Sequence, residues 1–160
     1  MRIGFGYDAH RLAAGRKCIL CGVEIPSPLG PHGHSDADAP VHALIDAMLG
    51  ALALGDIGTL FPDSDSRYEM ADSIELLKKV YCLVNENGYI LSNADITIIL
   101  QSPHLGQYIM QMRQKLAQAL DTEIGAISVK ATTEEKMGFT GDGTGIACTA
   151  VAALTVRCVP

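Results

Sequence analysis

Three segments of the chain repeat an apolar residue every three or four positions, which is the spacing of a helix that buries one face. They predict helices at residues 38–54, 72–86 and 107–120. Ser35, Asp36 and Asp38 are candidate N-caps for the first helix, because a short polar side chain can accept the first free backbone N–H groups. Pro40 suits its first turn, and Gly55 is expected to end it.

Other segments show the alternating or continuous apolar pattern of strands. The predicted strands cover residues 2–8, 17–25, 89–101, 126–131 and 146–158. Gly4 and Gly6 interrupt the first of them, and the second is expected to be one unbroken strand. Segments rich in glycine, proline or acidic residues predict loops at 26–33, 55–67 and 138–145.

Because strands and helices roughly alternate, we expect an α+β (α/β) fold with a single β-sheet and helices packed on one face. The apolar runs at 96–100 and 146–156 suggest a sheet that is buried on both faces. A chain of 160 residues forms one domain, 1–160, and can cover its second sheet face by self-association.

Composition narrows the function. Lys and Arg number 12 against 18 Asp and Glu, so the net charge of −6 argues against a nucleic-acid partner. No run of about 20 apolar residues is present, so no membrane span is expected. The first eight residues lack the apolar run of a signal peptide, which predicts a cytoplasmic (bacterial) protein, or a plastid-type stromal one if a leader has been removed.

Five cysteines lie at positions 18, 21, 82, 148 and 158. The odd number, and the apolar runs around most of them, favour reduced thiols in a reducing compartment. Cys18 and Cys21 form a Cys-x-x-Cys pair without the second pair of a zinc ribbon, so we interpret them as buried thiols.

Asp8, His10 and His42 are the strongest candidates for chemistry. Asp8 and His10 can point to one side of a strand, and two imidazoles with one carboxylate are a common ligand set for catalytic zinc. Asp46, one helical turn after His42, could hold the other ring nitrogen. The same residues also fit a strand-end hydrogen-bond pair and a packed core histidine, and spacing alone favours this second interpretation, because His42 lies 32 residues after His10. Asp46 and the polar segment 34–38 before the apolar helix leave both interpretations open.

Three loops are further candidates. The acidic segment 56–65 could bind hydroxyls, a cation or water, or be a solvated loop with Asx turns. Thr132 to Lys136 fits phosphate contacts with a bridging cation, and also a capping box with Thr132 as N-cap and Glu135 at N3. The glycines of 138–145 lack the spacing of a P-loop or a dinucleotide-binding motif, and both are rejected.

Six motifs in order along nearly the whole chain resemble one family. They are Gly-x-Asp-x-His at 6–10, His-Ser-Asp-Ala-Asp-x-x-x-His-Ala-Leu-x-Asp-Ala at 34–47, Leu-Gly-Asp-Ile-Gly-x-Leu-Phe-Pro-Asp-x-Asp at 54–65, Asn-Ala-Asp-Ile-Thr-Ile-Ile at 93–99, Val-Lys-Ala-Thr-Thr-x-Glu-Lys-x-Gly-Phe-Thr-Gly at 129–141 and Gly-Ile-Ala-Cys at 145–148. The sequence closely resembles the 2-C-methyl-D-erythritol 2,4-cyclodiphosphate synthase family of non-mevalonate isoprenoid biosynthesis.

The resemblance implies a mixed sheet in a homotrimer, with active sites between subunits. It implies a cyclising phosphorus–oxygen lyase acting on 4-diphosphocytidyl-2-C-methyl-D-erythritol 2-phosphate. The 2-phosphate attacks the β-phosphorus of the diphosphate, the ring of the 2,4-cyclodiphosphate closes, and CMP leaves.

The resemblance also implies site residues. Zinc, or another divalent transition metal, would be held by Asp8, His10 and His42, and Mg²⁺ or Mn²⁺ bridging the diphosphate by Glu135. His34 and Thr133 are implied as the catalytic, transition-state contacts. The implied substrate-binding positions are Asp8, His10, His34, Ser35, Asp56, Ile57, Gly58, Phe61, Pro62, Asp63, Ser64, Asp65, Leu100, Gln101, Ser102, Pro103, His104, Leu105, Gly106, Ala131, Thr132, Thr133, Glu134, Glu135 and Phe139.

Four positions depart from the family pattern. Asp142, Thr149 and Phe5 stand where Arg, Glu and His are usual, near the threefold channel where some members bind an isoprenoid diphosphate. Asp142 would repel such an anion, so we expect no effector there. His104 stands where Lys is common, and we expect cytidine binding to survive because contacts there are largely with the backbone.

Two other functions fit part of the pattern. A zinc-dependent phosphohydrolase would use Asp56 or Asp63 as the base that activates water. A non-enzymatic module would bind cytidine nucleotides equally well without metal.

Overall fold

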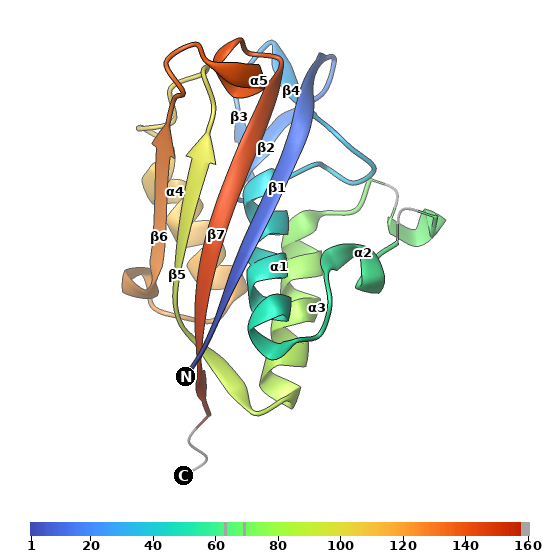
Figure 1. The fold of residues 1–160 in the computed structure, drawn as a ribbon, viewed down its shortest axis with the longest axis vertical. Coiled ribbons are helices and arrows are strands. Elements are labelled where there is room, and N and C mark those ends of the chain that lie inside the picture. The colour runs from blue at the N-terminus through green and yellow to red at the C-terminus, as the bar shows by residue number, and fades with distance from the viewer. Residues whose placement is uncertain (63, 69, 158–160) are drawn as a thin grey trace.

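The computed structural model describes residues 1–62, 64–68 and 70–157, and its centre is a mixed sheet with helices on one side (Figure 1). Within these residues five strands lie in the order β4-β1-β7-β5-β6, with β5 and β6 parallel and the other neighbours antiparallel. The strands are β1 Arg2–Ala14, β4 Leu29–His32, β5 Tyr89–Ile99, β6 Ile127–Thr132 and β7 Gly145–Val156. The predicted α+β class, with one main sheet covered by helices, is confirmed.

The helices that cover the sheet lie close to their predicted positions. They are α1 Ala39–Leu52, α3 Ser73–Glu86 and α4 Ile109–Ala119. Asp38 is the N-cap of α1 and accepts a hydrogen bond from the Val41 N–H, as expected of one of the three candidates. The prediction that Gly55 ends this helix is wrong, because Ala53 already adopts a left-handed conformation with φ 58°.

Gly4 and Gly6 let α1 lie directly on β1. A Cβ atom built on Gly4 would lie 1.9 Å from the Ala47 carbonyl oxygen, and one on Gly6 would lie 1.9 Å from that of Ala43. Alternate residues of a strand share a face, so Asp8 points to the same side as these two glycines. The glycines that seemed to interrupt the strand therefore bring helix α1 up to the carboxylate.

The second predicted strand, 17–25, is wrong. It is a hairpin of β2 Cys18–Leu20 and β3 Val23–Ile25, turned at Cys21 and Gly22 with φ values of 52° and 70°. Two successive positive φ values give the tight turn that matches the twist of paired strands. The predicted loop 26–33 contains the edge strand β4, where proline is tolerated because no second neighbour needs its N–H.

Asp38 links the hairpin to α1. It is fully buried, and its carboxylate accepts the N–H groups of Cys21 at 2.8 Å and Gly22 at 2.6 Å besides capping the helix. Burial, with the nearby charge of Asp36, raises the pKa of Asp38 to about 7, although the two backbone donors of the hairpin act in the opposite direction.

The other predicted loops contain short helices. Segment 55–67 forms α2 Ile57–Leu60 and part of a 3₁₀ turn at Ser66–Tyr68, another such turn covers Ile124–Ala126, and 138–145 begins with α5 Gly138–Gly141. The capping box at Thr132 is wrong, since the next helix begins only after Met137. Asp56 caps α2 by accepting the Thr59 N–H. This helix was not predicted because four residues are too few to show a helical repeat of apolar positions.

The sheet face away from the helices is exposed in the single chain. Ile3, Phe5 and Tyr7 on β1 are 67%, 63% and 51% exposed, and Val151 on β7, directly opposite Phe5, is 40% exposed. We call these four residues the apolar sheet face. Burial on both sheet faces is therefore not achieved within one chain.

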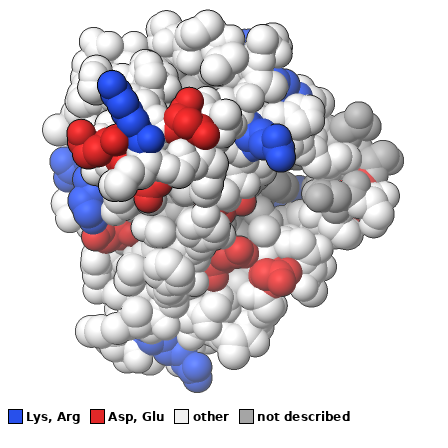
Figure 2. Space-filling view, turned by 45° about the horizontal axis from the view of Figure 1, so that its top comes forward, with Lys and Arg blue, Asp and Glu red and all other residues white. Residues whose placement is uncertain are grey.

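On the side of the molecule drawn in Figure 2, acidic and basic side chains are interspersed. Within residues 1–62, 64–68 and 70–157, none of the helices is long and apolar enough to span a membrane.

Candidate metal centre and active site

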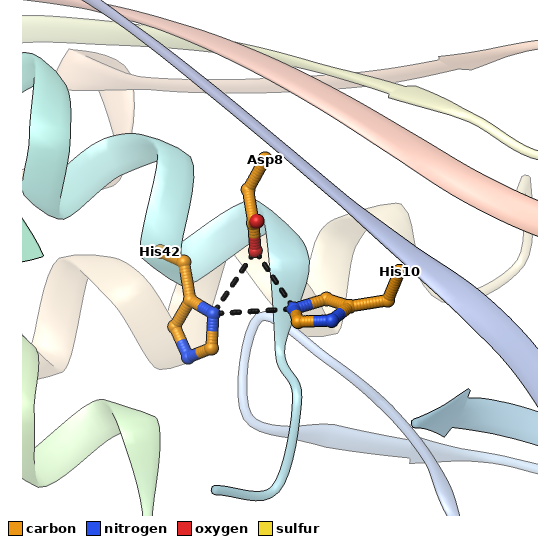
Figure 3. A group of neighbouring side chains, drawn as sticks. All are labelled: Asp8, His10 and His42. Atoms are coloured by element: carbon orange, nitrogen blue, oxygen red, sulfur yellow. Dashed lines mark hydrogen bonds and ion pairs between the residues drawn. The ribbon is translucent and has the colours of Figure 1, made fainter. Parts of the chain in front are cut away.

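Asp8 and His10 from β1 and His42 from α1 converge on one point (Figure 3). The Asp8 Oδ2 atom lies 2.9 Å from His10 Nε2 and 3.0 Å from His42 Nδ1, and the two nitrogens are 3.5 Å apart. Ligands about 2.0–2.2 Å from a tetrahedral zinc ion lie roughly 3.3–3.6 Å from one another. The three atoms thus need to spread by only a few tenths of an ångström, and they fit a divalent metal.

The contacts of Asp8 with two histidines favour its ligating form. Its side chain is 23% exposed, and burial alone would raise its pKa, but the hydrogen bonds and positive charge of His10 and His42 hold it well below the usual range. The carboxylate is therefore ionised at neutral pH, as a metal ligand must be. Burial lowers the pKa of His42, but the hydrogen bond to Asp8 and the negative charges of Asp8, Asp38 and Asp36 together outweigh it and leave that pKa raised in the metal-free chain.

The second nitrogen of His42 does not contact Asp46, contrary to prediction. Asp46 instead accepts the Ile57 N–H at 2.7 Å and so anchors α2. The His42 Nε2 atom lies 2.8 Å from the Ser73 hydroxyl at the start of α3 and 3.3 Å from that of Ser35. Sequence analysis missed Ser73, because nothing in the pattern relates the start of one helix to a side chain 31 positions earlier.

A cavity of about 370 Å³ opens beside the three ligands, and we call it the metal-centre cavity. Of the predicted substrate-binding residues, it is lined by Asp8, His10, His34, Ser35, Ile57, Gly58 and Phe61, and Gly33, Tyr68 and Leu76 are additional. The Nε2 atom of His34 is buried and has no hydrogen-bond partner among the described residues. Phe61 and Tyr68 pack edge to face at 5.1 Å, a pairing that the spacing of a loop does not reveal.

Arg16 holds the segment that carries His34 and Ser35. Its guanidinium donates to the carbonyl oxygens of Ser35 at 2.9 Å, Gly33 at 3.3 Å and Pro31 at 3.4 Å. These contacts fix the backbone on both sides of His34, and the sequence analysis gave Arg16 no role.

The other described residues of the acidic loop do not line this cavity. Asp56 is exposed and bound to Thr59, and Asp65 forms an ion pair with Arg67 at 2.6 Å. Pro62 and Ser64 do not line the cavity. Asp63 lies outside the described residues.

A separate hollow of about 360 Å³ lies where β5 and β6 end, and we call it the β5–β6 pocket. Its lining includes the predicted residues Leu100, Pro103, His104, Leu105, Gly106, Ala131, Thr132 and Thr133, together with Ile109. Gln101 and Ser102 belong to the same loop but do not line the pocket, and the Gln101 side chain accepts the Lys136 N–H at 3.3 Å. This pocket and the metal-centre cavity have no lining residue in common.

Glu135 does not reach the three ligands within one chain. It is exposed, and its carboxylate accepts the Thr133 hydroxyl at 2.8 Å. Glu134 is bound by the Thr140 hydroxyl, and Phe139 lines a third hollow that it shares with His10. Among the described residues, the group able to hold a metal ion is Asp8, His10 and His42 alone.

The model of the YgbB family matches residues 1–155, and the chain belongs to this family. It is 56% identical over 154 residues to 2-C-methyl-D-erythritol 2,4-cyclodiphosphate synthase of Brachyspira hyodysenteriae, covering 96% of this chain and 98% of that protein.

Solved structures show the same fold. The bifunctional IspDF of Campylobacter jejuni matches with a TM-score of 0.93 and 42% identity over 97% of this chain, which spans 42% of that longer one. The CDP complex of IspF from Plasmodium falciparum matches with a TM-score of 0.87 and 32% identity, covering 98% of this chain and 97% of that chain.

Proposed function

We propose that this chain, as one domain of residues 1–160, converts 4-diphosphocytidyl-2-C-methyl-D-erythritol 2-phosphate to 2-C-methyl-D-erythritol 2,4-cyclodiphosphate and CMP. The observation that carries the proposal is the convergence of Asp8, His10 and His42 beside a cavity. The motifs that hold these residues are far apart in the sequence, and the relatives of this chain bear the name of this synthase.

The reaction brings two anionic phosphoryl groups together, so the site must neutralise charge and hold a folded substrate. Asp8, His10 and His42 would hold zinc or another divalent transition metal, which would supply Lewis-acid stabilisation when bound. Ser35 can donate a hydrogen bond to a phosphate oxygen, and the unpartnered Nε2 of His34 can do so in its protonated tautomer.

We infer that a neighbouring copy supplies the other half of the site in a homotrimer. The β5–β6 pocket fits the cytidine, with Thr133 as a transition-state contact and Glu135 holding Mg²⁺ or Mn²⁺ on the diphosphate. Two observations support this arrangement: the pocket is separate from the metal centre in one chain, and the apolar sheet face is exposed. Large exposed apolar patches mark association surfaces.

We propose a bacterial cytoplasmic enzyme, or a stromal one in a plastid. The cysteines within the described residues, at positions 18, 21, 82 and 148, are free thiols, which suits a reducing compartment.

Phosphorus NMR of the purified protein with its substrate tests the proposal. CMP and a cyclic diphosphate are expected, and a chelator should abolish both. Inorganic phosphate without a cyclic product would instead indicate the phosphohydrolase. CDP binding that is unchanged by metal removal, with no turnover, would indicate the nucleotide-binding module.

A further inference from the structure

We propose that Ser73 and Asp36 are positioning residues that fix the ring orientation and tautomer of His42, so that its Nδ1 lone pair faces Asp8 and His10. The inference rests on the metal site of the proposed function. It concerns a chain of contacts at the second ring nitrogen of His42, made by two residues that do not line the metal-centre cavity.

The hydrogen bonds have a single consistent direction. The Ser73 hydroxyl donates to Asp36 Oδ1, and the Ser73 backbone N–H donates to Asp36 Oδ2 at 3.0 Å. A hydroxyl carries one proton, so the Ser73 oxygen can offer only a lone pair to His42 Nε2, 2.8 Å away. His42 must then carry its proton on Nε2, which leaves Nδ1 free to bind a cation.

Both partners are held in place by their surroundings. Ser73 is fully buried at the first position of α3. Asp36 accepts the Asp38 N–H at 3.2 Å, and its own N–H donates to the Ala71 carbonyl at 3.2 Å. The contact therefore ties the start of α3 to the segment before α1 and leaves the imidazole one orientation.

Helix capping does not account for the Ser73 hydroxyl. The N-cap of α3 is Asp72, whose carboxylate accepts the Ile74 N–H at 2.8 Å. Ser35 is a weaker alternative partner for His42, because its hydroxyl is 3.3 Å from Nε2 and already accepts the Ala37 N–H. Ser73 thus provides the shorter contact, and the helix does not need it for its cap.

The test measures metal affinity in the full-length protein by competition between the chain and a chromogenic chelator for Zn²⁺, with the Co²⁺ absorption spectrum as a report of ligand geometry. Ser73→Ala should weaken Zn²⁺ binding about 10- to 100-fold, the usual effect of losing a contact behind a metal ligand. It should also speed solvent exchange of the His42 Nε2 proton in the zinc-loaded protein, as seen by NMR.

Asp36→Asn is a second variant that keeps the side-chain shape. Its amide can donate to the Ser73 oxygen, which frees the Ser73 proton to point at His42 Nε2 and favours the tautomer with the proton on Nδ1. Metal affinity should fall at least as far as in Ser73→Ala.

Asp72→Ala is the matched control, because it removes the cap of α3 without touching His42. Thermal unfolding should show it to be at least as destabilised as Ser73→Ala, with Zn²⁺ affinity near that of the unaltered chain. Equal losses of affinity in Ser73→Ala and Asp72→Ala, or no loss in Ser73→Ala and Asp36→Asn, would overturn the inference. If the unaltered chain binds no Zn²⁺ through His42, the proposed function fails instead.

Discussion

The metal-centre cavity and the β5–β6 pocket are similar in volume but differ in how far one chain completes them. The ligands of the first come from a strand and a helix whose backbones are in direct contact, and each ligand is fixed by another polar group. In the second, the lining residue Thr133 contacts Glu135 near the surface, and none of the lining residues belongs to the group of Asp8, His10 and His42. The metal centre is therefore preorganised within one chain, whereas the proposed function needs a neighbouring copy to bring the pocket to a metal centre.

The largest expected effect comes from His42→Ala, which removes one of the three ligands. Zinc should be lost, and with it several kcal/mol of transition-state stabilisation, or about 10³-fold or more in kcat/KM. Metal analysis and a CMP-release assay measure both. His32→Ala, a change to an exposed histidine on β4, is the control and should alter neither quantity. A His42→Ala variant that retains zinc and turnover would break the assignment.

Phe5→Glu tests whether the pocket depends on a second copy. A charge buried at a subunit contact without a partner costs several kcal/mol, enough to weaken association about 10³-fold. Analytical ultracentrifugation should show dissociation with loss of activity but with zinc retained. Met110→Glu places the same charge on an exposed apolar residue of α4 and should leave the assembly intact. A fully active Phe5→Glu monomer would contradict the proposal that a neighbouring copy supplies part of the active site.

Glu135→Gln separates the two regions without disturbing assembly. We expect kcat/KM to fall about 10²-fold, the order for losing one stabilising group, with zinc content unchanged and a higher Mg²⁺ requirement. A Mg²⁺ titration of CMP release measures this. Glu123→Gln, at an exposed carboxylate before the 3₁₀ turn, serves as the control. Loss of zinc in Glu135→Gln would show that the two regions are not independent.

The last prediction concerns the pH dependence of stability. The pKa of Asp38 is about 7 in the folded chain against an ordinary value of 3.8, so between these values the folded state binds more protons than the unfolded state. This group therefore makes the unfolding free energy fall as pH rises from about 4 to 7. Urea unfolding should show that Asp38→Asn flattens the decline, while Asp121→Asn at an exposed site does not. If the unfolding free energy of Asp38→Asn falls with pH as steeply as that of the unaltered chain, the raised pKa of Asp38 is contradicted.

Sequence periodicity predicted the parts of the fold whose signal is local. Helices α1, α3 and α4 each repeat their apolar positions over several turns, so their predicted ends lie within two residues of the observed ones. The β2–β3 hairpin and β4 were missed, because a turn at Cys21 with positive φ and a proline-containing edge strand go against the usual preferences. Tertiary contacts override weak local propensity in such segments.

The residues of the candidate site were likewise predicted only in part. Asp8, His10 and His42 could be proposed from residue type, but spacing left a core histidine equally open until the distances were known. The role of Asp46 was wrong, and Ser73 was missed, because hydrogen-bond partners depend on side-chain directions that periodicity does not encode.

Because Gly4 and Gly6 have no side chains, the backbones of β1 and α1 lie in direct contact. Helix and strand each supply ligands, so the distance between their axes sets how far the His42 ring stands from the Asp8 carboxylate. A single methyl group at either glycine would force the two backbones apart and widen the ligand triangle, although neither residue touches the metal centre. The spacing of the three ligands therefore depends on the absence of side chains at Gly4 and Gly6, which face Ala47 and Ala43, within five residues of His42 on α1.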